Sequence, residues 1–434
     1  MSPVSVGCIG IGVLLLMFIL RMPVAFAMAF VGFVGFAYLG TPGAACNILA
    51  RDIFEQFSSY SLSVIPMFIL MGSFAFASGI TGRLYKTAYT WVGQLRGGLA
   101  IATTLACGGF AAICGSTAAT AATMGKIALP EMKKYNYDDV LATGTVAASG
   151  TLGILIPPST ILIVYGLLTE QSIGRLFIAG ILPGLLLTLF FALTIVLICR
   201  RNPELGPSGP PTTWHEKLRA VAGIVEPLVL FGLAIGGLFL GWFSPTQAGA
   251  IGAGGALLIG LVRRELTWRN FFEAGKDALR TSCMVICIIT GATIFGHFMA
   301  VTTIPFMLAD WVGGFTLPPA AIMGIVVLIF FVLGCFIDAM ALLVLLVPIL
   351  FPVVIGFGFD LIWFGVIIVL VSQMGVITPP VGVNVFVVKG IAEDVPLEAI
   401  FKGILPFLIA LIVCTGILVA FPQIATFLPS LVKY

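Results

Sequence analysis

The sequence contains few charged residues. Only 9% of its 434 residues are Asp, Glu, Lys or Arg, whereas about a quarter of the residues of a soluble globular domain are charged. Hydrophobic residues make up 60% of the chain, and the mean hydropathy is +1.18. This balance excludes a soluble globule. The chain is therefore expected to be an all-α, polytopic membrane protein.

Residues that hold metals or form disulfides are also scarce. The chain has two histidines, His215 and His297, and nine cysteines that are scattered through apolar stretches without CxxC spacing. A zinc site and a disulfide framework are therefore not expected. No GxxxxGK[ST] phosphate loop occurs, so energy for any work that the protein does must come from an ion gradient or from a partner.

Motifs of enzymes that work inside a membrane are missing as well. GFGFD at 356–360 has GxGxD spacing rather than the GxGD of aspartyl intramembrane proteases. No HExxH occurs, and His297 has no evident serine partner motif. We therefore expect no enzymatic activity. Besides an enzyme, a passive channel is an alternative class of membrane protein, because interrupted membrane helices also line pores.

Several apolar stretches approach or exceed the length of a spanning helix, which needs about 20 mostly apolar residues. They lie near 4–20, 22–40, 62–79, 176–199, 222–243, 246–262, 281–300 and 403–429. The first has no basic residue before it and Arg21 after it, which is the reverse of a secretory signal. We expect it to be a retained first helix.

Two further apolar stretches carry matching interruptions, GILIPPST at 153–160 and GVITPPVGVN at 375–384. Prolyl pairs remove backbone donors and glycines permit unusual dihedral angles, so helical hydrogen bonding should lapse at both places. Carbonyl groups freed inside a bilayer need a partner, and a bound cation is one. Matching broken helices in two halves of a membrane protein indicate a transporter's binding site.

The two halves share other landmarks in the same order. WVG at 91–93 recurs at 311–313, which indicates a duplication. The long apolar stretches 98–132 and 316–356 both have turn-forming residues at the centre, which predicts two re-entrant helical hairpins. The alternative is a plain spanning helix with a small-residue packing face.

The distribution of Lys and Arg predicts the orientation, because these residues accumulate in cytoplasmic loops. Most of the 21 basic residues lie in a few loops and segments, which can all be placed on one side of the membrane. These are Arg21, 83–96, 133–134, 200–219, 263–280 and the region around 402. If that side is the cytoplasm, the two hairpins enter from opposite sides. The repeats are then inverted, and both termini are periplasmic.

Together these segments resemble the large membrane subunit of TRAP (tripartite ATP-independent periplasmic) transporters, of the DctM type. The resemblance covers nearly the whole chain. It rests on VIPMFILMGSFAFASGITGRLY at 64–85, GGLAIATTLACGGFAAICGSTAATAATMGKIALPEM at 97–132, GTLGILIPPSTILIVYG at 150–166, SPTQAGAIGA at 244–253 and VITPPVGVNVFVVKGIA at 376–392.

The resemblance implies an elevator-type fold and a sodium-coupled importer in the bacterial inner membrane. The implied substrate is an organic carboxylate such as a C4-dicarboxylate or a sialic acid. The implied partners are a small four-helix membrane subunit, a periplasmic substrate-binding protein and the lipid bilayer, with no nucleic acid. A stand-alone sodium/carboxylate symporter that needs no binding protein is the alternative function.

The resemblance also implies that a mobile transport domain moves against a scaffold. The expected divisions are N-terminal scaffold helices at 1–97, a first hairpin and broken helix at 98–172, scaffold helices at 173–315, a second hairpin and broken helix at 316–398, and a C-terminal helix at 399–434. Within the central scaffold we expect a cytoplasmic linker at 200–220, which is rich in Pro and Gly at its start, and an interfacial helix at 264–280.

At least two sodium sites are expected where a hairpin tip meets a break, because unwound carbonyls and hydroxyls supply oxygen ligands without net charge. The first candidate set is Gly115, Ser116, Thr117, Gly153, Ile156 and Pro158. The second is Gly334, Asp338, Gly375, Thr378 and Val381. The alternative is that these glycines and prolines only kink helices for packing.

Asp338 is the conspicuous charge of the second hairpin, where a carboxylate is costly unless it faces a cavity or a cation. It could instead cap the second half-helix. For the organic carboxylate we expect contacts from Ser116, Ser159, Thr160 and Asn384, with half-helix ends supplying dipoles.

Overall fold

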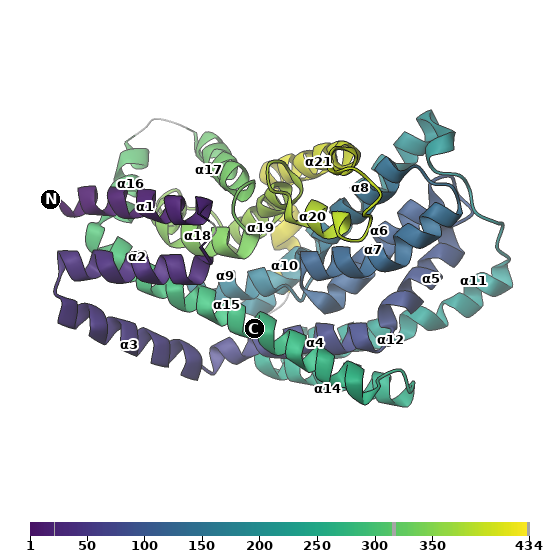
Figure 1. The fold of residues 1–434 in the computed structure, drawn as a ribbon, viewed down its shortest axis with the longest axis horizontal. Coiled ribbons are helices and arrows are strands. Elements are labelled where there is room, and N and C mark those ends of the chain that lie inside the picture. The colour runs from purple at the N-terminus through teal and green to yellow at the C-terminus, as the bar shows by residue number, and fades with distance from the viewer. Residues whose placement is uncertain (21, 315–317, 432–434) are drawn as a thin grey trace.

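Every secondary-structure element in the described part of the chain is a helix. The computed structural model describes residues 1–20, 22–314 and 318–431. Arg21, the predicted division between 315 and 316, and the last three residues of the predicted C-terminal helix lie outside these ranges. The molecule is elongated, with its N-terminus at one end and α11 (Trp214–Ala220) at the other (Figure 1).

The N-terminal region contains short helices that precede the first hairpin. They are α1 (Pro3–Ile19), α2 (Val24–Leu39), α3 (Pro42–Ser58), η1 (Ser61–Ser63), α4 (Val64–Ala77) and α5 (Ile80–Val92). Thr41 begins α3 by accepting a hydrogen bond from the Ala44 backbone N–H, with Pro42 in the first turn. The chain bends by 54° between α3 and the following η1–α4 unit.

The first repeat forms a helical hairpin followed by a broken helix. Its elements are α6 (Gly98–Cys114), α7 (Thr117–Lys134), α8 (Asp139–Ser149), η2 (Gly150–Ile154) and α9 (Thr160–Leu168). Only Gly115 and Ser116 join α6 to α7, and the two helices pack against each other. Helical structure lapses between Ile154 and Thr160, at the prolyl pair that predicts the break.

A long apolar helix and an irregular segment connect the repeats. The elements are α10 (Ile173–Arg201), η3 (Pro203–Leu205), α11, α12 (Ala222–Phe231), the π-helical η4 (Gly232–Gly236), α13 (Gly237–Phe239) and α14 (Pro245–Val262). The predicted linker contains η3 and α11. Ser244 and Gln247 form a capping box that begins α14.

The second repeat has the same order of elements as the first. The helices α15 (Trp268–Thr302) and α16 (Ile304–Gly313) precede it. It consists of the hairpin α17 (Pro319–Gly334) and α18 (Ala339–Gly356), followed by α19 (Leu361–Ile377) and α20 (Val383–Lys389) on either side of the second break. The chain ends with α21 (Leu397–Ala420) and α22 (Gln423–Leu431).

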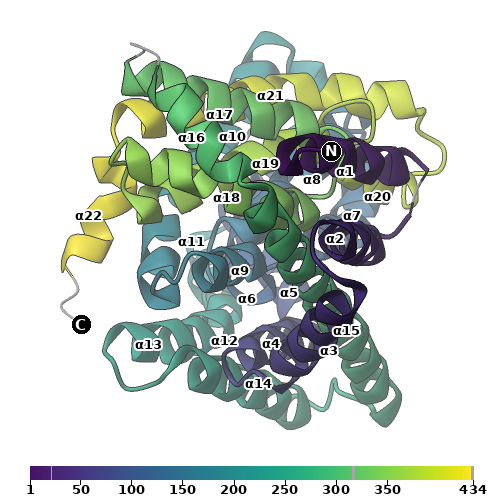
Figure 2. The same ribbon diagram turned by 90° about the vertical axis from the view of Figure 1, so that its left-hand side faces the viewer.

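Two predicted segments have different boundaries in the structure. Most of 264–280 is the first part of α15, which continues for 35 residues without interruption, because no Pro stands inside it. The apolar stretch 403–429 is not one helix, because α21 ends at Ala420 and α22 begins after Pro422. Figure 2 shows α22 at one edge of the molecule and α20 toward the other, with α18 and α19 between them.

Six helical segments in the described ranges are long and apolar enough to cross a membrane, or seven if the bent α3–α4 pair counts as one span. They are Ile173–Arg201, Trp214–Phe239, Pro245–Val262, Trp268–Thr302, Ala339–Gly356 and Leu397–Ala420. The chain is therefore a multi-span membrane protein, as the composition predicts.

Glycines allow close helix packing at two places that organise the fold. Between α2 and α15, a Cβ at Gly32 would lie 2.7 Å from the Phe295 backbone. Between α8 and α21, a Cβ at Gly144 would lie 2.4 Å from Gly403. Small residues let backbones approach in this way in membrane proteins. The second contact ties the C-terminal helix α21 to the first broken helix.

Candidate functional site

The tip of the first hairpin lies directly against the first break. Gly115 adopts φ +66°, and a Cβ there would lie 2.7 Å from the Pro158 carbonyl oxygen. The Thr160 hydroxyl donates a hydrogen bond of 2.9 Å to the Gly115 carbonyl. Gly153 in the break also lies close to the hairpin tip, because a Cβ there would be 2.5 Å from the Ser116 carbonyl oxygen. These residues form the first tip–break contact.

Two other predicted residues of the first sodium set lie at its margin. Thr117 is the first residue of α7, whose N-cap Ser116 accepts a hydrogen bond of 3.4 Å from the Ala119 N–H. The Ile156 side chain packs toward α10, where a Cβ at Gly184 would lie 2.5 Å from it. The whole segment 151–159 is buried. The first break is therefore enclosed by protein on all sides.

The second hairpin and the second break make the corresponding contact. A Cβ at Gly375 would lie 2.2 Å from the Gly334 carbonyl carbon. The Val381 N–H donates to the Cys335 carbonyl over 3.4 Å. Gly334, Cys335, Gly375 and Val381 form the second tip–break contact. Here Pro379, Pro380 and Val381 are exposed, so this break is open where the first is enclosed.

Asp338 and Thr378 are engaged with the ends of their own helices. The Asp338 carboxylate caps α18 by accepting a hydrogen bond of 2.9 Å from the Met340 N–H, and the residue is exposed. The Thr378 hydroxyl donates to the Met374 carbonyl over 2.6 Å at the end of α19. The capping alternative for Asp338 is thus the contact present in the structure.

Two of the four candidate substrate residues are fully buried, and the other two, Ser116 and Thr160, are half-buried. Ser159 is fully buried and caps α9, with its hydroxyl oxygen 3.2 Å from the Leu162 N–H. Asn384 is also fully buried, and its Nδ2 donates to the Ala147 carbonyl over 3.2 Å. This bond links α20 of the second repeat to α8 of the first. Within the described ranges the Asn384 Oδ1 has no hydrogen-bond partner.

A second link between the repeats lies in exposed loops. Lys133, at the end of α7, forms an ion pair with Asp394, which precedes α21. The hydrogen bond from the Lys133 ammonium lowers the pKa of the Asp394 carboxyl. Such an exposed pair contributes little stability by itself. It shows that the end of the first hairpin lies next to the loop that follows the second broken helix.

The chemistry that the two contacts can support follows from their donor sets. Each contact joins the C-terminal end of one helix to the N-terminal start of another, where backbone groups lack helical partners. No group of three or more His, Cys, Asp or Glu side chains able to hold a metal ion occurs in the described residues. Carbonyl and hydroxyl oxygens are therefore the main ligands on offer, and they suit a hard monovalent cation.

Sequence reasoning overlooked three residues near these contacts. Thr120 lies one turn into α7, and a Cβ at Gly153 would come within 2.6 Å of its hydroxyl oxygen. Cys335 supplies a backbone carbonyl at the second tip. Gln373 is fully buried in α19, with neither side-chain polar atom hydrogen-bonded. A polar residue in an otherwise apolar helix was the available signal for Gln373.

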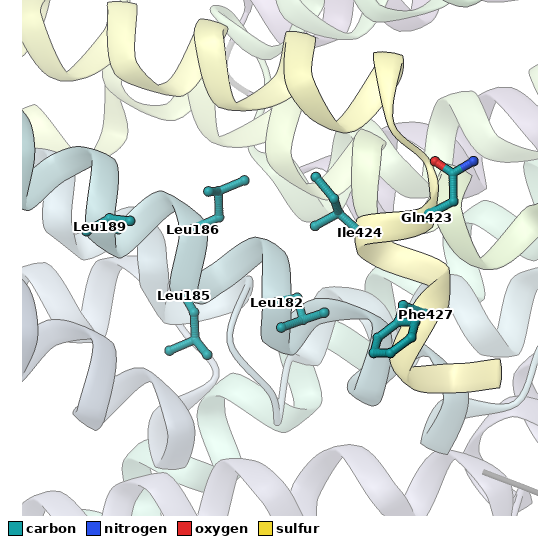
Figure 3. Close-up of a pocket in the computed structure, with 7 residues that line it drawn as sticks. All are labelled: Leu182, Leu185, Leu186, Leu189, Gln423, Ile424 and Phe427. Carbon is teal, nitrogen blue, oxygen red and sulfur yellow. The ribbon is translucent and has the colours of Figure 1, made fainter. Parts of the chain in front are cut away.

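One open cavity lies away from both contacts. A space of about 520 Å³ between α10 and α22 is lined by apolar side chains apart from Gln423 (Figure 3). Leu185 and Leu189 on its α10 side are more than half exposed. It lacks the polar groups that would orient a carboxylate. We therefore place the candidate site at the two tip–break contacts.

Comparison with known proteins gives a consistent result. The family described as "Tripartite ATP-independent periplasmic transporter, DctM component" matches residues 11–424. The C4-dicarboxylate TRAP transporter large permease protein DctM of Pseudomonas aeruginosa is 37% identical over 88% of this chain and 89% of its own length. The sialic acid TRAP transporter large permease protein SiaM of Vibrio cholerae is 34% identical over 94% of this chain and 95% of its own length.

Solved structures show the same type of fold at low sequence identity. The YdaH transporter of Alcanivorax borkumensis superposes with a TM-score of 0.62 at 15% identity, covering 89% of this chain and 90% of that one. This likeness concerns the fold alone.

Proposed function

The chain belongs to the family of the DctM component of tripartite ATP-independent periplasmic transporters, and from this membership we propose that it imports an organic carboxylate, driven by a sodium gradient. It is a transport protein, not an enzyme, as are its relatives. The relatives named above carry C4-dicarboxylates and sialic acid, so these are the substrate classes to test first.

The observation that carries the proposal is the pair of tip–break contacts. Each contact brings backbone carbonyl oxygens of a hairpin tip close to a break, and the first contact adds the Thr160 hydroxyl. At the first contact, the close approach of Gly153 to the Ser116 carbonyl keeps tip and break together. We assign one sodium ion to each contact, with the carboxylate held by Ser116, Ser159, Thr160 and Asn384 between them.

The proposed mechanism is an elevator motion of inverted repeats. The hydrogen bond from Asn384 to Ala147 and the ion pair of Lys133 with Asp394 support movement of 98–172 and 316–398 as one unit. The tight contact of Gly403 with Gly144 adds α21 to that unit. The remaining helices, including the α2–α15 pair, would form the scaffold.

The proposed assembly follows from the tripartite family. A periplasmic binding protein delivers the carboxylate, and a small four-helix membrane subunit joins the scaffold. We place the complex in the bacterial inner membrane with both termini of this chain in the periplasm, because most Lys and Arg residues then lie in cytoplasmic loops.

The test is uptake by proteoliposomes that contain this chain and its small subunit. Radiolabelled succinate and sialic acid are supplied with and without the binding protein and an inward sodium gradient. Uptake that requires both supports the proposal. Uptake with sodium alone identifies a stand-alone symporter, and uptake that ignores sodium rejects ion coupling.

A further inference from the structure

Gln373 is a buried amide without a partner in the central helix of the molecule. All residues of α19 from Ile362 to Ile377 are buried, and Gln373 is fully buried. Neither Oε1 nor Nε2 has a hydrogen-bond partner among the residues that the structure describes. The neighbouring Ser372 is satisfied, because its hydroxyl donates to the Ile368 carbonyl over 2.7 Å. The unsatisfied amide is therefore specific to Gln373 rather than general to this part of the helix.

The position of Gln373 directs its side chain away from the second hairpin tip. Gly375 faces Gly334 in the second tip–break contact. Residues two positions apart in an α-helix, such as Gln373 and Gly375, project about 160° apart around the axis. Gln373 therefore lies on the side of α19 opposite to Gly375. Along its whole length α19 contacts η2 and α9, which flank the first break, as well as α17, α18 and α21. Gln373 thus lies in the helix that carries the second tip–break contact and also contacts the elements of the first break.

The equivalent residue of the first repeat shows no such deficit. The spacing that relates Gly153 to Gly375 relates Thr151 to Gln373. The Thr151 hydroxyl donates to the Ala148 carbonyl over 2.6 Å. The duplicated architecture therefore does not require an unsatisfied polar group at this position.

We propose that Gln373 is a substrate-binding residue whose amide N–H groups donate to a carboxylate oxygen of the transported organic acid. The inference rests on the proposed function, which brings a carboxylate to the region between the breaks. A sodium ion would engage only Oε1 and would leave both N–H donors unsatisfied. A carboxylate supplies the acceptors that these donors lack.

An unsatisfied buried amide lowers stability, so its presence needs a reason other than folding. Replacing such a group by an apolar one of similar size is close to neutral or stabilising. Functional sites are where a chain retains residues that are unfavourable for folding. Gln373→Leu removes both polar atoms and keeps most of the side-chain volume. It should therefore separate a role of the amide in substrate binding from a role in folding.

The experiment compares wild type, Gln373→Leu and the control Ser372→Ala in the same proteoliposomes, with succinate and sialic acid as substrates. We expect Gln373→Leu to raise the KM for the carboxylate roughly tenfold or more, the loss that corresponds to one hydrogen bond to a charged group. The sodium concentration for half-maximal uptake should stay unchanged. Ser372→Ala should keep the wild-type KM.

Thermal unfolding of the purified proteins supplies the second measurement. Without substrate, Gln373→Leu should unfold at the wild-type temperature or above it. A lower unfolding temperature would mean that the amide is hydrogen-bonded within the folded protein, and an unchanged KM would mean that it does not meet the substrate. Either result overturns the inference. If the wild-type protein showed no sodium-driven uptake, the proposed function would be rejected instead. The unfolding comparison would still test whether the Gln373 amide is unsatisfied in the folded protein.

Discussion

Gly375→Ala tests the second tip–break contact with a single added methyl group. The new Cβ would lie 2.2 Å from the Gly334 carbonyl carbon and 2.4 Å from its oxygen. Ordinary contacts of a Cβ begin near 3.4 Å, so the two backbones must separate by about 1 Å. No side-chain rotation can relieve the clash, because the atoms that are met belong to the backbone of the hairpin tip.

The size of this displacement sets the expected loss. Ligands of a bound metal ion need to lie within about 0.2 Å of their ideal distances, and a separation of about 1 Å exceeds that several times. We expect Gly375→Ala to lower sodium-driven uptake at least about a hundredfold, as misplacements of this size do in other sites. Overpacking should cost about 1–3 kcal/mol of stability, which leaves folded protein in the membrane.

Two matched substitutions serve as controls for the added methyl group. Gly334→Ala acts on the same contact from the other side, where the nearest atom is a Leu342 side-chain carbon at 3.3 Å and can move. Gly324→Ala lies in the same hairpin with nothing within 4 Å of the added Cβ. Uptake by Gly324→Ala should equal that of wild type, and Gly334→Ala should lose much less than Gly375→Ala. Equal uptake by Gly375→Ala and Gly324→Ala would refute the reasoning.

Two further substitutions probe other contacts. Thr160→Val removes the hydrogen bond across the first tip–break contact and should lower sodium-driven uptake while changing stability by only about 1 kcal/mol. Unaltered uptake would argue against a role of this contact in transport. Glu226→Gln weakens the ion pair with Arg83, in which both side chains are mostly buried, and should lower the free energy of unfolding by roughly 1–3 kcal/mol. The same exchange at the exposed Glu55 should change the unfolding temperature little.

The positions of the two breaks could be predicted from the sequence because their cause is local. A prolyl pair lacks two backbone donors wherever it stands, so α19 ends at Ile377 and η2 at Ile154, as the pattern predicts. The hairpin turns were predictable for a similar reason. Gly115 takes a positive φ that other residues rarely adopt, and the Ser116 that follows is a good N-cap.

Features that depend on packing between distant segments could not be predicted in this way. The charged segment 264–280 differs in composition from the apolar 281–300, yet its residues from 268 onward form one helix with 281–300, because neither Pro nor a cap separates them. The partners of Asn384 and the closeness of Gly144 to Gly403 involve residues far apart in sequence. Composition and periodicity carry no information about such pairs.

The two breaks have related sequences and related contacts, but they differ in exposure. The first is buried throughout 151–159, whereas Pro379, Pro380 and Val381 of the second are exposed. Local sequence does not explain this difference, because both breaks contain a prolyl pair between apolar helices. It arises from their surroundings, since α10 lies against the first break at Gly184.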